Sequence, residues 1–502
     1  MARMLYSLVL LPFCAGIAAL LLHGDRWRRA LLVSVAAGHL ALTLSAWIHR
    51  PPAALAGWLG LDAPGLIFLT LASILFLASM IYALGYLSHE KQHNDAPTRD
   101  FVEGGFFTNA PEAILSACLL FFLSTMSLVC ISQHLGLFWV AIESTTLASA
   151  PLIYFHRHRR SLAAAWKYLL ICSIGIALAL LGNFLLAAAT MNASGEETPL
   201  LLNALIARAP AMNPLWLKAS FLFLLIGYGT KMGLAPLHTW LPDAHSESPS
   251  IVSALLSGAL LNCAFLGILR AHQICSAAGL AAFTQDLLIL FGLLSMGFAA
   301  VFILYQTDFK RMLAYSSVEH MGILALGVGL SKAGAFGAMF HAVNHSLTKG
   351  MLFLVAGNIL AAYKTKSTTE VRALGRRLPL SSILWLAGFF AITGTPPFGT
   401  FLSEFTILKS AIDQNRIGVA IAYLALLAII FMAMLTIVMR MAQGSEASAI
   451  SSSPSHAGNW RESVLSIAPP AVLGLLVFCA GIYMPPVVAS TLHEAARLLG
   501  GQ

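Results

Sequence analysis

Three ionisable residues recur at helical spacing inside one apolar stretch. His341, His345 and Lys349 follow one another at intervals of four residues, so a helix would present them on one face. Histidine changes charge near neutral pH and a buried lysine gives up its proton readily, which suits this face to a proton relay through intervening water. A metal site is the alternative. It lacks the intervening acid of an H-E-x-x-H motif and a clear third ligand, so we expect no metal.

Two further charges lie alone in other apolar stretches. Glu143 is in the middle of LGLFWVAIESTTLASAPLIYF, and Lys231 is near the end of a stretch that closes with GYGTKMGLAP. A charge at the bilayer centre costs about 2.5–3.5 kcal/mol even on lenient insertion scales. We therefore predict that Glu143 and Lys231 pair across helices, so that their separation would drive the lysine proton onward. A purely structural ion pair is the alternative.

Two stretches contain helix breakers beside an ionisable residue. Pro236 follows Lys231, and Pro396 and Pro397 precede Glu404. Proline cannot continue the helical hydrogen-bond ladder, and broken helices are tolerated in membranes where they line a cavity. We therefore predict two broken helices and add Glu404 to the proton-carrying residues.

Five more polar residues allow two interpretations each. Lys167 begins an apolar stretch, as a structural anchor or as part of the relay. The others either extend the relay or lie at a membrane edge without a proton-carrying role: His238, His245, Glu319 and His320.

The composition shows what must position these residues. Hydrophobic residues make up 58% of the chain and charged residues 10%, whereas a soluble domain carries about 25% charged residues. Unalternating apolar runs do not suit a transmembrane barrel, and a helical span needs about 20 apolar residues, which predicts an all-α polytopic membrane protein of about 14 transmembrane helices. The predicted spans lie near 4–22, 29–48, 64–87, 112–131, 134–154, 162–190, 214–235, 249–269, 276–304, 312–330, 335–362, 380–409, 417–441 and 464–484.

The two broken helices are spans 7 and 12, five spans apart. This spacing is typical of two inverted five-helix repeats, here spans 4–8 and 9–13. We expect one integral membrane domain across 1–502. Its parts are three N-terminal spans in 1–111, a first repeat in 112–270, a second in 276–441 and a C-terminal span in 442–502.

The net charge of +8 could indicate nucleic-acid binding, but the distribution of charge argues against it. Lysines and arginines are more numerous in the odd-numbered connections than in the even-numbered ones, which is a positive-inside bias. The odd connections are then cytoplasmic, and both termini lie on the outer side of a bacterial or archaeal cell (inner) membrane. The run HRHRR at 156–160 is most simply a topology signal. Contact with anionic lipid or a partner is the weaker interpretation.

No pattern for a bound cofactor is present. The seven cysteines stand singly, without the paired spacing of an iron–sulfur or zinc site. There is no P-loop and no dinucleotide-binding glycine pattern. We expect no cofactor in this chain, so an ion gradient or partner subunits must supply the energy.

Four motifs resemble those of one known family: GTKMGLAPLHTWLPDAHSESPSIVSALLSG, TDFKRMLAYSSVEHMG, FHAVNHSLTKGMLFLVAGN and GTPPFGTFLSEF. Over about 110–440 the chain resembles the antiporter-like proton-translocating membrane subunits of respiratory complex I, of group 4 membrane-bound hydrogenases and of multisubunit cation/proton antiporters. Within that group it is most similar to hydrogenase-4 component F. The resemblance implies fourteen helices with inverted repeats.

The resemblance also implies a role for each candidate residue. Glu143 and Lys231 would be the ion-paired gate, Glu404 the exit-side residue, and the histidines and lysine of the 335–362 span the central connection. Two positions depart from some relatives. Asn262 stands where some have a lysine, and Glu404 replaces a lysine found in others. The chain also lacks the long lateral helix that extends past the fourteenth span in some relatives.

Three functions would use the same residues. The favoured one is a proton-translocating subunit of a redox-driven, hydrogenase-type complex, and a complex I subunit is close to it. The alternative is a proton-conducting subunit coupled to a non-redox partner, either a soluble inorganic-carbon uptake protein or a cation/proton antiporter assembly. A scaffold without transport is a further possibility. We expect membrane lipid, other subunits and protons as partners, with protons favoured over Na⁺ because no all-oxygen cage stands out.

Overall fold

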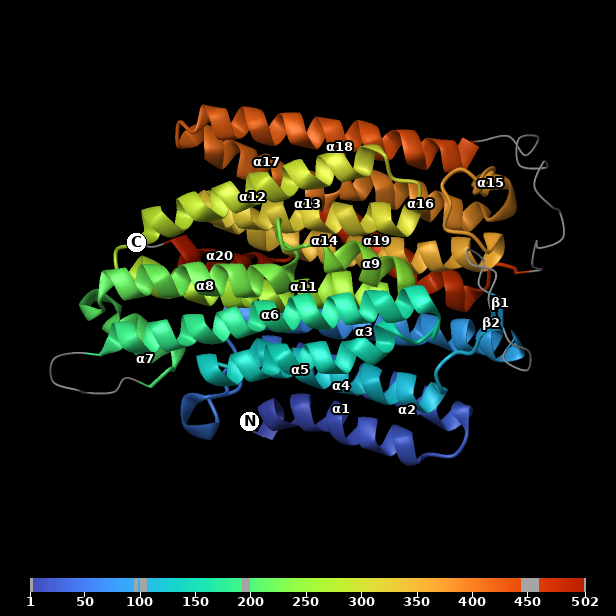
Figure 1. Ribbon diagram of the computed structural model, residues 1–502, viewed down its shortest axis with the longest axis horizontal. Helices are drawn as coiled ribbons and strands as arrows, with labels where there is room; N and C mark the ends of the chain where they lie inside the picture. The colour runs from blue at the N-terminus through green and yellow to red at the C-terminus, as the bar shows by residue number, and fades with distance from the viewer. Residues whose placement is uncertain (1–2, 94–97, 100–105, 192–198, 444–459, 501–502) are drawn as a thin grey trace.

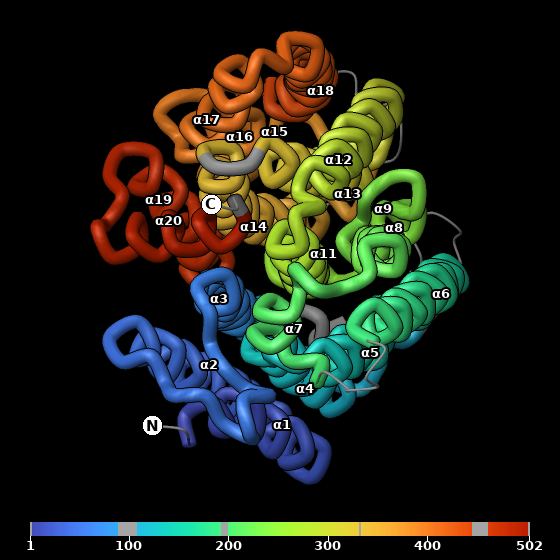
Figure 2. The backbone as a smooth tube through the Cα atoms, turned by 90° about the vertical axis from the view of Figure 1, so that its left-hand side faces the viewer, coloured from blue at the N-terminus to red at the C-terminus, as the bar shows by residue number. Residues whose placement is uncertain are grey.

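The computed structural model describes residues 3–93, 98–99, 106–191, 199–443 and 460–500. Most of its long helices run along the long axis of the molecule (Figure 1). Seen end-on, they form an elongated bundle with α1 and α2 at one end of the cross-section and α18 at the other (Figure 2). Between the predicted spans, the connection 88–111 lies partly, and the connection 442–463 mostly, outside the described residues.

The elements have the following bounds: α1 Arg3–Leu21, α2 Asp25–Ile48, η1 Leu55–Gly57, α3 Ala63–His93, β1 Thr98–Arg99, β2 Phe106–Phe107, α4 Glu112–Ile131, α5 Leu135–Ile153, α6 Arg159–Thr190, α7 Leu202–Arg208, η2 Ala209–Ala211, α8 Pro214–Met232, α9 Trp240–Glu247, α10 Ser250–Leu255, η3 Leu256–Leu260, α11 Leu261–Ala277, α12 Ala281–Leu304, α13 Phe309–Gly329, α14 Ser331–Tyr363, α15 Leu374–Arg377, α16 Pro379–Ile392, α17 Gly399–Asp413, α18 Ile417–Gln443, α19 Val464–Ile482 and α20 Pro486–Gly500. The two short strands pair antiparallel.

Within the described residues, eleven helices are long and apolar enough to cross a membrane. The other three predicted spans correspond to α8, to α13 and to the interrupted pair α16 and α17. These segments carry the charges and breaks that lower their hydropathy. The all-helical membrane fold is confirmed, and the count of fourteen and the inverted repeats stay predictions. The largest shift in a boundary is at α11, which runs to Ala277 where the sequence predicted an end near 269.

Both predicted helix breaks are present. α8 ends at Met232, and Gly233 follows in the left-handed region with φ 89° before α9 begins. α16 ends at Ile392, and Gly394 has φ 64° before α17 begins. A Cβ on Gly394 would collide with the Glu404 carboxylate, so only glycine lets the broken chain pass this close to the acid.

The centre of the bundle is α14. It packs against α13, α16, α17, α19 and α20, and also against α3 and α10. The neighbouring span built from α10, η3 and α11 is buried along its whole apolar window. Its middle is a single π-helical turn, η3, and such turns are frequent at functional sites. Ionisable residues on α14 are therefore shielded from lipid on most sides.

The described residues include helices outside the predicted spans: the short helices α7, α9 and α15, and the longer α20 in a region, 442–502, for which a single span was predicted. The additional helix, α20, is amphipathic and turns Leu492, Ala495 and Leu499 into the bundle. Arg50 donates two hydrogen bonds of 2.7 Å to the Glu494 carboxylate, which ties α20 to the end of α2.

Asn358 joins four helices near one end of α14. Tyr82 Oη donates to Asn358 Oδ1 at 2.8 Å. Asn358 Nδ2 donates to Ser381 Oγ at 3.1 Å and to the Ser466 carbonyl at 3.0 Å. All its polar atoms are thereby satisfied, as polar side chains between membrane helices need to be.

Candidate functional site

Lys231 is fully buried in the last turn of α8. Its Nζ donates to Thr146 Oγ1 at 2.7 Å and to Tyr168 Oη at 2.6 Å. Nζ also lies 4.6 Å from the centre of the Tyr168 ring, within cation–π range. Ser149 Oγ lies 2.6 Å from the same tyrosine oxygen. Hydroxyl groups of α5 and α6 thus surround the ammonium.

Glu143 reaches this site indirectly. Its Oε2 accepts a hydrogen bond from Thr146 Oγ1 at 3.3 Å, and its Oε1 accepts one from Ser173 Oγ at 2.8 Å. Among the described residues, no direct ion pair joins Glu143 to Lys231. The predicted partners are neighbours, but the Thr146 hydroxyl lies between them, accepting from the lysine and donating to the carboxylate.

Lys167, for which anchor and relay stayed open, is in an ion pair. Its Nζ lies 2.7 Å from Asp243 Oδ2, and Arg311 contacts the other oxygen of that carboxylate at 2.9 Å. The aspartate therefore connects α6, α9 and α13. This contact supports the interpretation as an anchor and leaves the relay untested.

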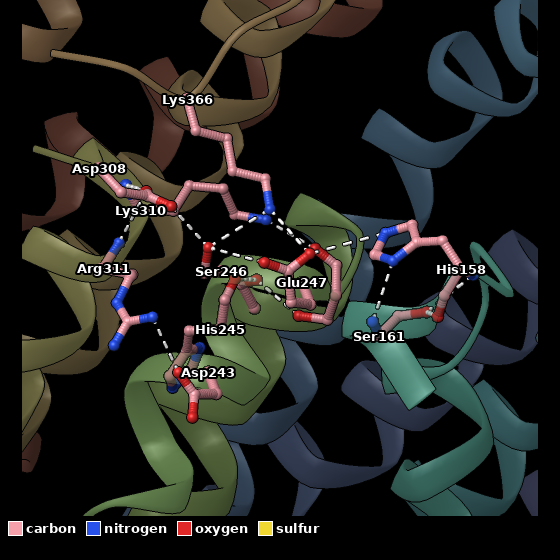
Figure 3. A network of polar contacts seen from close by, with 12 residues as sticks. His158, Ser161, Asp243, His245, Ser246, Glu247, Asp308, Lys310, Arg311 and Lys366 are labelled. Carbon is pink, nitrogen blue, oxygen red and sulfur yellow. Dashed lines mark hydrogen bonds and ion pairs between the residues drawn. The ribbon is translucent and has the colours of Figure 1, made fainter. Parts of the chain in front are cut away.

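A network of charges surrounds the end of α9, near the start of α6 (Figure 3). Glu247 Oε2 lies 3.0 Å from Lys366 Nζ and 3.6 Å from His158 Nε2. The His158 Nδ1 atom accepts from the Ser161 backbone N–H at 3.0 Å, so the ring proton is on Nε2 and faces the carboxylate. Ser246 Oγ donates to Asp308 Oδ2 at 2.6 Å. Four separate segments meet here.

The charges of this network change the acidity of Glu247. Burial alone would raise the pKa of its carboxyl group, but the positive charges of Lys366 and Arg160 outweigh burial and hold the pKa below its usual range. Burial lowers the pKa of nearby His156 to about 3, and the charges of Lys310 and Lys366 add to the effect. His156 is therefore neutral near pH 7, whereas Glu247 is ionised.

The central histidines meet a third histidine from another helix. His341 and His345 lie on one face of α14, as predicted, and His320 of α13 faces both. His320 Nδ1 is 2.8 Å from His341 Nε2, and the ring centroids of His320 and His345 are 5.1 Å apart. His341 Nδ1 is 2.9 Å from Ser403 Oγ of α17. The structure thus brings His320, which the sequence left open, into the cluster.

Several fully buried polar atoms near α14 find no hydrogen-bond partner in the part of the chain that the structure describes. They are both ring nitrogens of His245 and of His345, His320 Nε2, Asn262 Oδ1, Asn344 Oδ1 and Glu404 Oε1. Buried polar groups of proteins are rarely left unpaired, and ordered water usually satisfies those without a protein partner. These atoms therefore form a row of polar positions that water would satisfy.

This row of atoms follows the axis of α14. His245 stacks on Phe353 with ring centroids 5.0 Å apart, and Asn262 Nδ2 donates to Ser346 Oγ at 2.7 Å. His341 lies at the other end, next to α17. A helix rises 1.5 Å per residue, so positions 341 to 353 span about 18 Å, more than half of a hydrocarbon core of about 30 Å.

Three other predicted residues remain, and their surroundings differ. Lys349 is fully buried and its Nζ donates to the Leu313 carbonyl at 2.7 Å. Glu319 is buried close enough to Lys349 and Glu404 to interact with both electrostatically. His238 packs instead against the rings of Phe298, Phe302 and Tyr315.

The sequence analysis missed the hydroxyl groups that connect the charges. Thr146, Tyr168, Ser149 and Ser403 all touch a predicted site residue or its partner. The one signal in the sequence is that Thr146 follows Glu143 by three residues, a spacing that places both on one helix face. The contacts of Tyr168 with Lys231, of Ser149 with Tyr168 and of Ser403 with His341 each join two different helices, and no spacing reveals them. In the described residues, no side-chain hydrogen bond links the Lys231 site to the cluster on α14.

This arrangement, ionisable residues along the middle of a multi-pass helical bundle with two broken helices, is that of an antiporter-like membrane subunit. Residues 132–436 match the model of the family described as NADH:quinone oxidoreductase/Mrp antiporter, transmembrane, and the chain belongs to that family. The resemblance noted in the sequence is thus confirmed.

One sequence relative and two solved structures support the membership of this family. The chain is 34% identical over 443 residues to the hydrogenase-4 component F homolog of Methylacidiphilum infernorum, covering 87% of this chain and 88% of the relative. Its fold matches a chain of the membrane-bound sulfane sulfur reductase, an archaeal respiratory membrane complex, with TM-score 0.84, 19% identity and coverage of 99% and 97%. A chain of respiratory complex I from Thermus thermophilus matches with TM-score 0.79, 23% identity and coverage of 99% and 100%.

These matches place the chain among the multi-pass membrane subunits of respiratory-type complexes. Such subunits are built into multisubunit assemblies, which confirms other subunits as partners in general terms.

Proposed function

We propose that this chain moves protons across a bacterial or archaeal cell membrane as a subunit of a redox-driven complex of the hydrogenase or quinone-oxidoreductase type. The similarity to a hydrogenase-4 component F homolog supports the type of complex. The chain itself holds no cofactor in this proposal. Electron transfer in partner subunits supplies the energy, and protons in water-filled segments are the cargo.

One observation carries the proposal, namely the row of buried, unpartnered polar atoms along α14. The row comprises histidine nitrogens, two amide oxygens and a carboxylate oxygen, among them those of His245 and Glu404. A structural role would pair these atoms with one another, as Asn358 is paired. A proton route needs them to exchange partners with water.

The Lys231 site supplies a loading step. A carboxylate nearby favours the ammonium form of a buried lysine. Thr146 links Glu143 to Lys231 through its two hydrogen bonds. When the bridge through Thr146 opens, the ammonium loses its support in a buried site and releases its proton toward water. The gap between Lys231 and the cluster on α14 is then crossed by water.

Ser403 sets the direction of the histidine hydrogen bonds. Its hydroxyl donates to the Thr400 carbonyl at 2.7 Å, so it accepts from His341 Nδ1–H. His341 Nε2 is then the acceptor and His320 Nδ1 the donor of the 2.8 Å bond between them. A proton arriving at His320 can pass to His341, and Glu404 of α17 lies next to this pair.

The charges around the end of α9 support the predicted orientation. Arg311 and Lys366 gather at this end (Figure 3), and Arg160 is close enough to act on Glu247 electrostatically. Cations favour the cytoplasmic side. In the proposal this end faces the cytoplasm and both termini face outward.

The family model also covers Mrp antiporters, so coupling to a non-redox partner is the second candidate. Mass spectrometry of the intact complex, purified gently by a tag on this chain, separates the two. Co-purified nickel–iron and iron–sulfur subunits would support the redox-driven pump. A single non-redox soluble companion, or an assembly of antiporter subunits alone, would overturn it.

A further inference from the structure

His320, His341 and Glu404 converge from three helices, α13, α14 and α17. One ligand atom of each lies within 4.8 Å of the others, and all three residues are buried. We propose that these residues form a binding site for one divalent transition-metal ion, of which Zn²⁺ is the best representative. From the sequence we expected no metal at His341 and His345. The group found here differs from that pair, because its three residues are far apart in the chain and His345 is not part of it.

The donor atoms are already aimed at one another. Ser403 holds His341 with its proton on Nδ1, which leaves the Nε2 lone pair directed at His320 Nδ1 across 2.8 Å. Two imidazole nitrogens on a tetrahedral Zn²⁺ are about 3.3 Å apart, given Zn–N distances of about 2.0–2.1 Å. To bind the ion, the two nitrogens must move apart by about half an ångström and both rings must turn so that their lone pairs meet it. The His320 proton moves from Nδ1 to Nε2, and the Glu404 carboxylate closes in from within 4.8 Å.

The third ligand is the buried carboxylate of Glu404, which has an oxygen free to bind a metal ion. Glu404 Oε1 has no hydrogen-bond partner in the described residues. Two histidines and one glutamate are a ligand set that proteins use for Zn²⁺ with one position left open. Ser403 accepts a hydrogen bond from the other ring nitrogen of His341. Such a bond commonly fixes the orientation of a metal-binding histidine.

A second carboxylate lies beside the ligand set. Glu319 is close enough to Glu404 to act on it electrostatically. Pro396 and Pro397, in the break between α16 and α17, are exposed.

A bound ion would occupy the two nitrogens that pass the proton in the proposed function. Binding would then block translocation. Binding itself does not depend on that function, whereas inhibition does.

The test is metal binding by the purified, chelator-washed complex, with Zn²⁺ counted per chain and Co²⁺ as the coloured probe. We expect one Zn²⁺ per chain that is removed by a strong chelator, and a Co²⁺ spectrum typical of a four-coordinate N/O site. In His341→Gln, His320→Gln and Glu404→Gln the affinity should fall at least tenfold. His345→Gln, one helical turn away and outside the ligand set, is the matched control and should keep the affinity.

Absence of binding by the unmodified complex would overturn the proposal, and this result does not depend on any variant folding. Equal affinity in all the variants, or equal loss in His345→Gln, would overturn it too, because the ion would then be elsewhere. A parallel Zn²⁺ titration of proton translocation in membrane vesicles should give inhibition at the same concentrations as binding. Binding without inhibition would keep the metal site and remove the proton route through these nitrogens.

Discussion

Lys231 and Glu143 are connected through one hydroxyl group. Thr146 Oγ1 lies 2.7 Å from the lysine Nζ and 3.3 Å from the glutamate Oε2. In a direct ion pair the ammonium would donate straight to the carboxylate, whereas here an intermediate hydroxyl accepts from the lysine and donates to the glutamate. Rotation of a single side chain is then sufficient to disconnect the acid from the lysine.

Thr146→Val should therefore lower proton translocation while the complex still assembles. The substitution keeps the shape and removes a hydrogen bond to a charged group, which is worth about 1.5–3 kcal/mol, or roughly tenfold to hundredfold in rate. Translocation by membrane vesicles, scaled to complex content, measures the effect. Thr146→Ser keeps a hydroxyl and should retain most of the rate. If valine were as active as threonine, the bridge would have no role.

His345→Gln should abolish most translocation, because both of its ring nitrogens are buried without a partner in the described residues and its ring lies beside His320. His39→Gln is the matched control. His39 is equally buried, but its nitrogens are bonded to Ser73 at 3.0 Å and Ser127 at 2.9 Å, as in a structural contact.

We expect a loss of at least tenfold for His345→Gln and little change in translocation per assembled complex for His39→Gln. Equal effects of the two substitutions would mean that burial, and not the position on α14, decides the outcome.

Asn358→Ala should destabilise the bundle without changing the rate per folded molecule. It removes three interhelical hydrogen bonds, each worth about 0.6 kcal/mol on average in membrane proteins, for a total of about 2 kcal/mol. Thermal unfolding in detergent measures the loss. Tyr82→Phe removes one of the three bonds and should cost about a third as much. A larger loss for Tyr82→Phe than for Asn358→Ala would contradict this assignment.

The contacts of Glu247 should make stability depend on pH. Its pKa is held below the usual value near 4.5 by Lys366 and Arg160 against the effect of burial. The stabilisation is therefore fully present above about pH 4.5 and is lost as the pH falls through the lower, folded-state pKa. The melting temperature of the unmodified protein should exceed that of Glu247→Gln at pH 7, and the two should converge in acid.

Glu370→Gln is the control for this experiment, because Glu370 is exposed in the same connection as Lys366. It should melt like the unmodified protein at every pH. A gap for Glu247→Gln that persisted unchanged into strong acid would show that the carboxylate charge is not what stabilises this end.

Much of the membrane topology follows from hydropathy alone. α4 has the predicted bounds, 112–131, because a continuous apolar run between polar residues leaves little choice. α20 was missed because its apolar residues occupy one face only and it follows directly after the last long apolar run. The break after Ile392 was predictable from Gly394, Pro396 and Pro397, which no helix accommodates together.

The site was predictable only in part. The charges stand out against an apolar background, so Glu143, Lys231 and the histidines of α14 were found from the sequence. Their connections depend on which helices are neighbours. Nothing in the sequence distinguishes Thr146 and Tyr168 from other hydroxyl-bearing residues. Only the packing of the helices places Thr146 Oγ1 at 2.7 Å and Tyr168 Oη at 2.6 Å from Lys231 Nζ. The meeting of His320, His341 and Glu404 has the same origin.

The central claim is that protons cross the membrane through Lys231. The direct measurement is proton translocation per electron transferred, in vesicles that contain the intact complex with Lys231→Ala. Assembly is checked by the amount of co-purified subunits. We predict a normal amount of complex and at least a tenfold fall in translocation. Translocation equal to that of the unmodified complex would contradict the account and leave the buried lysine with a structural role.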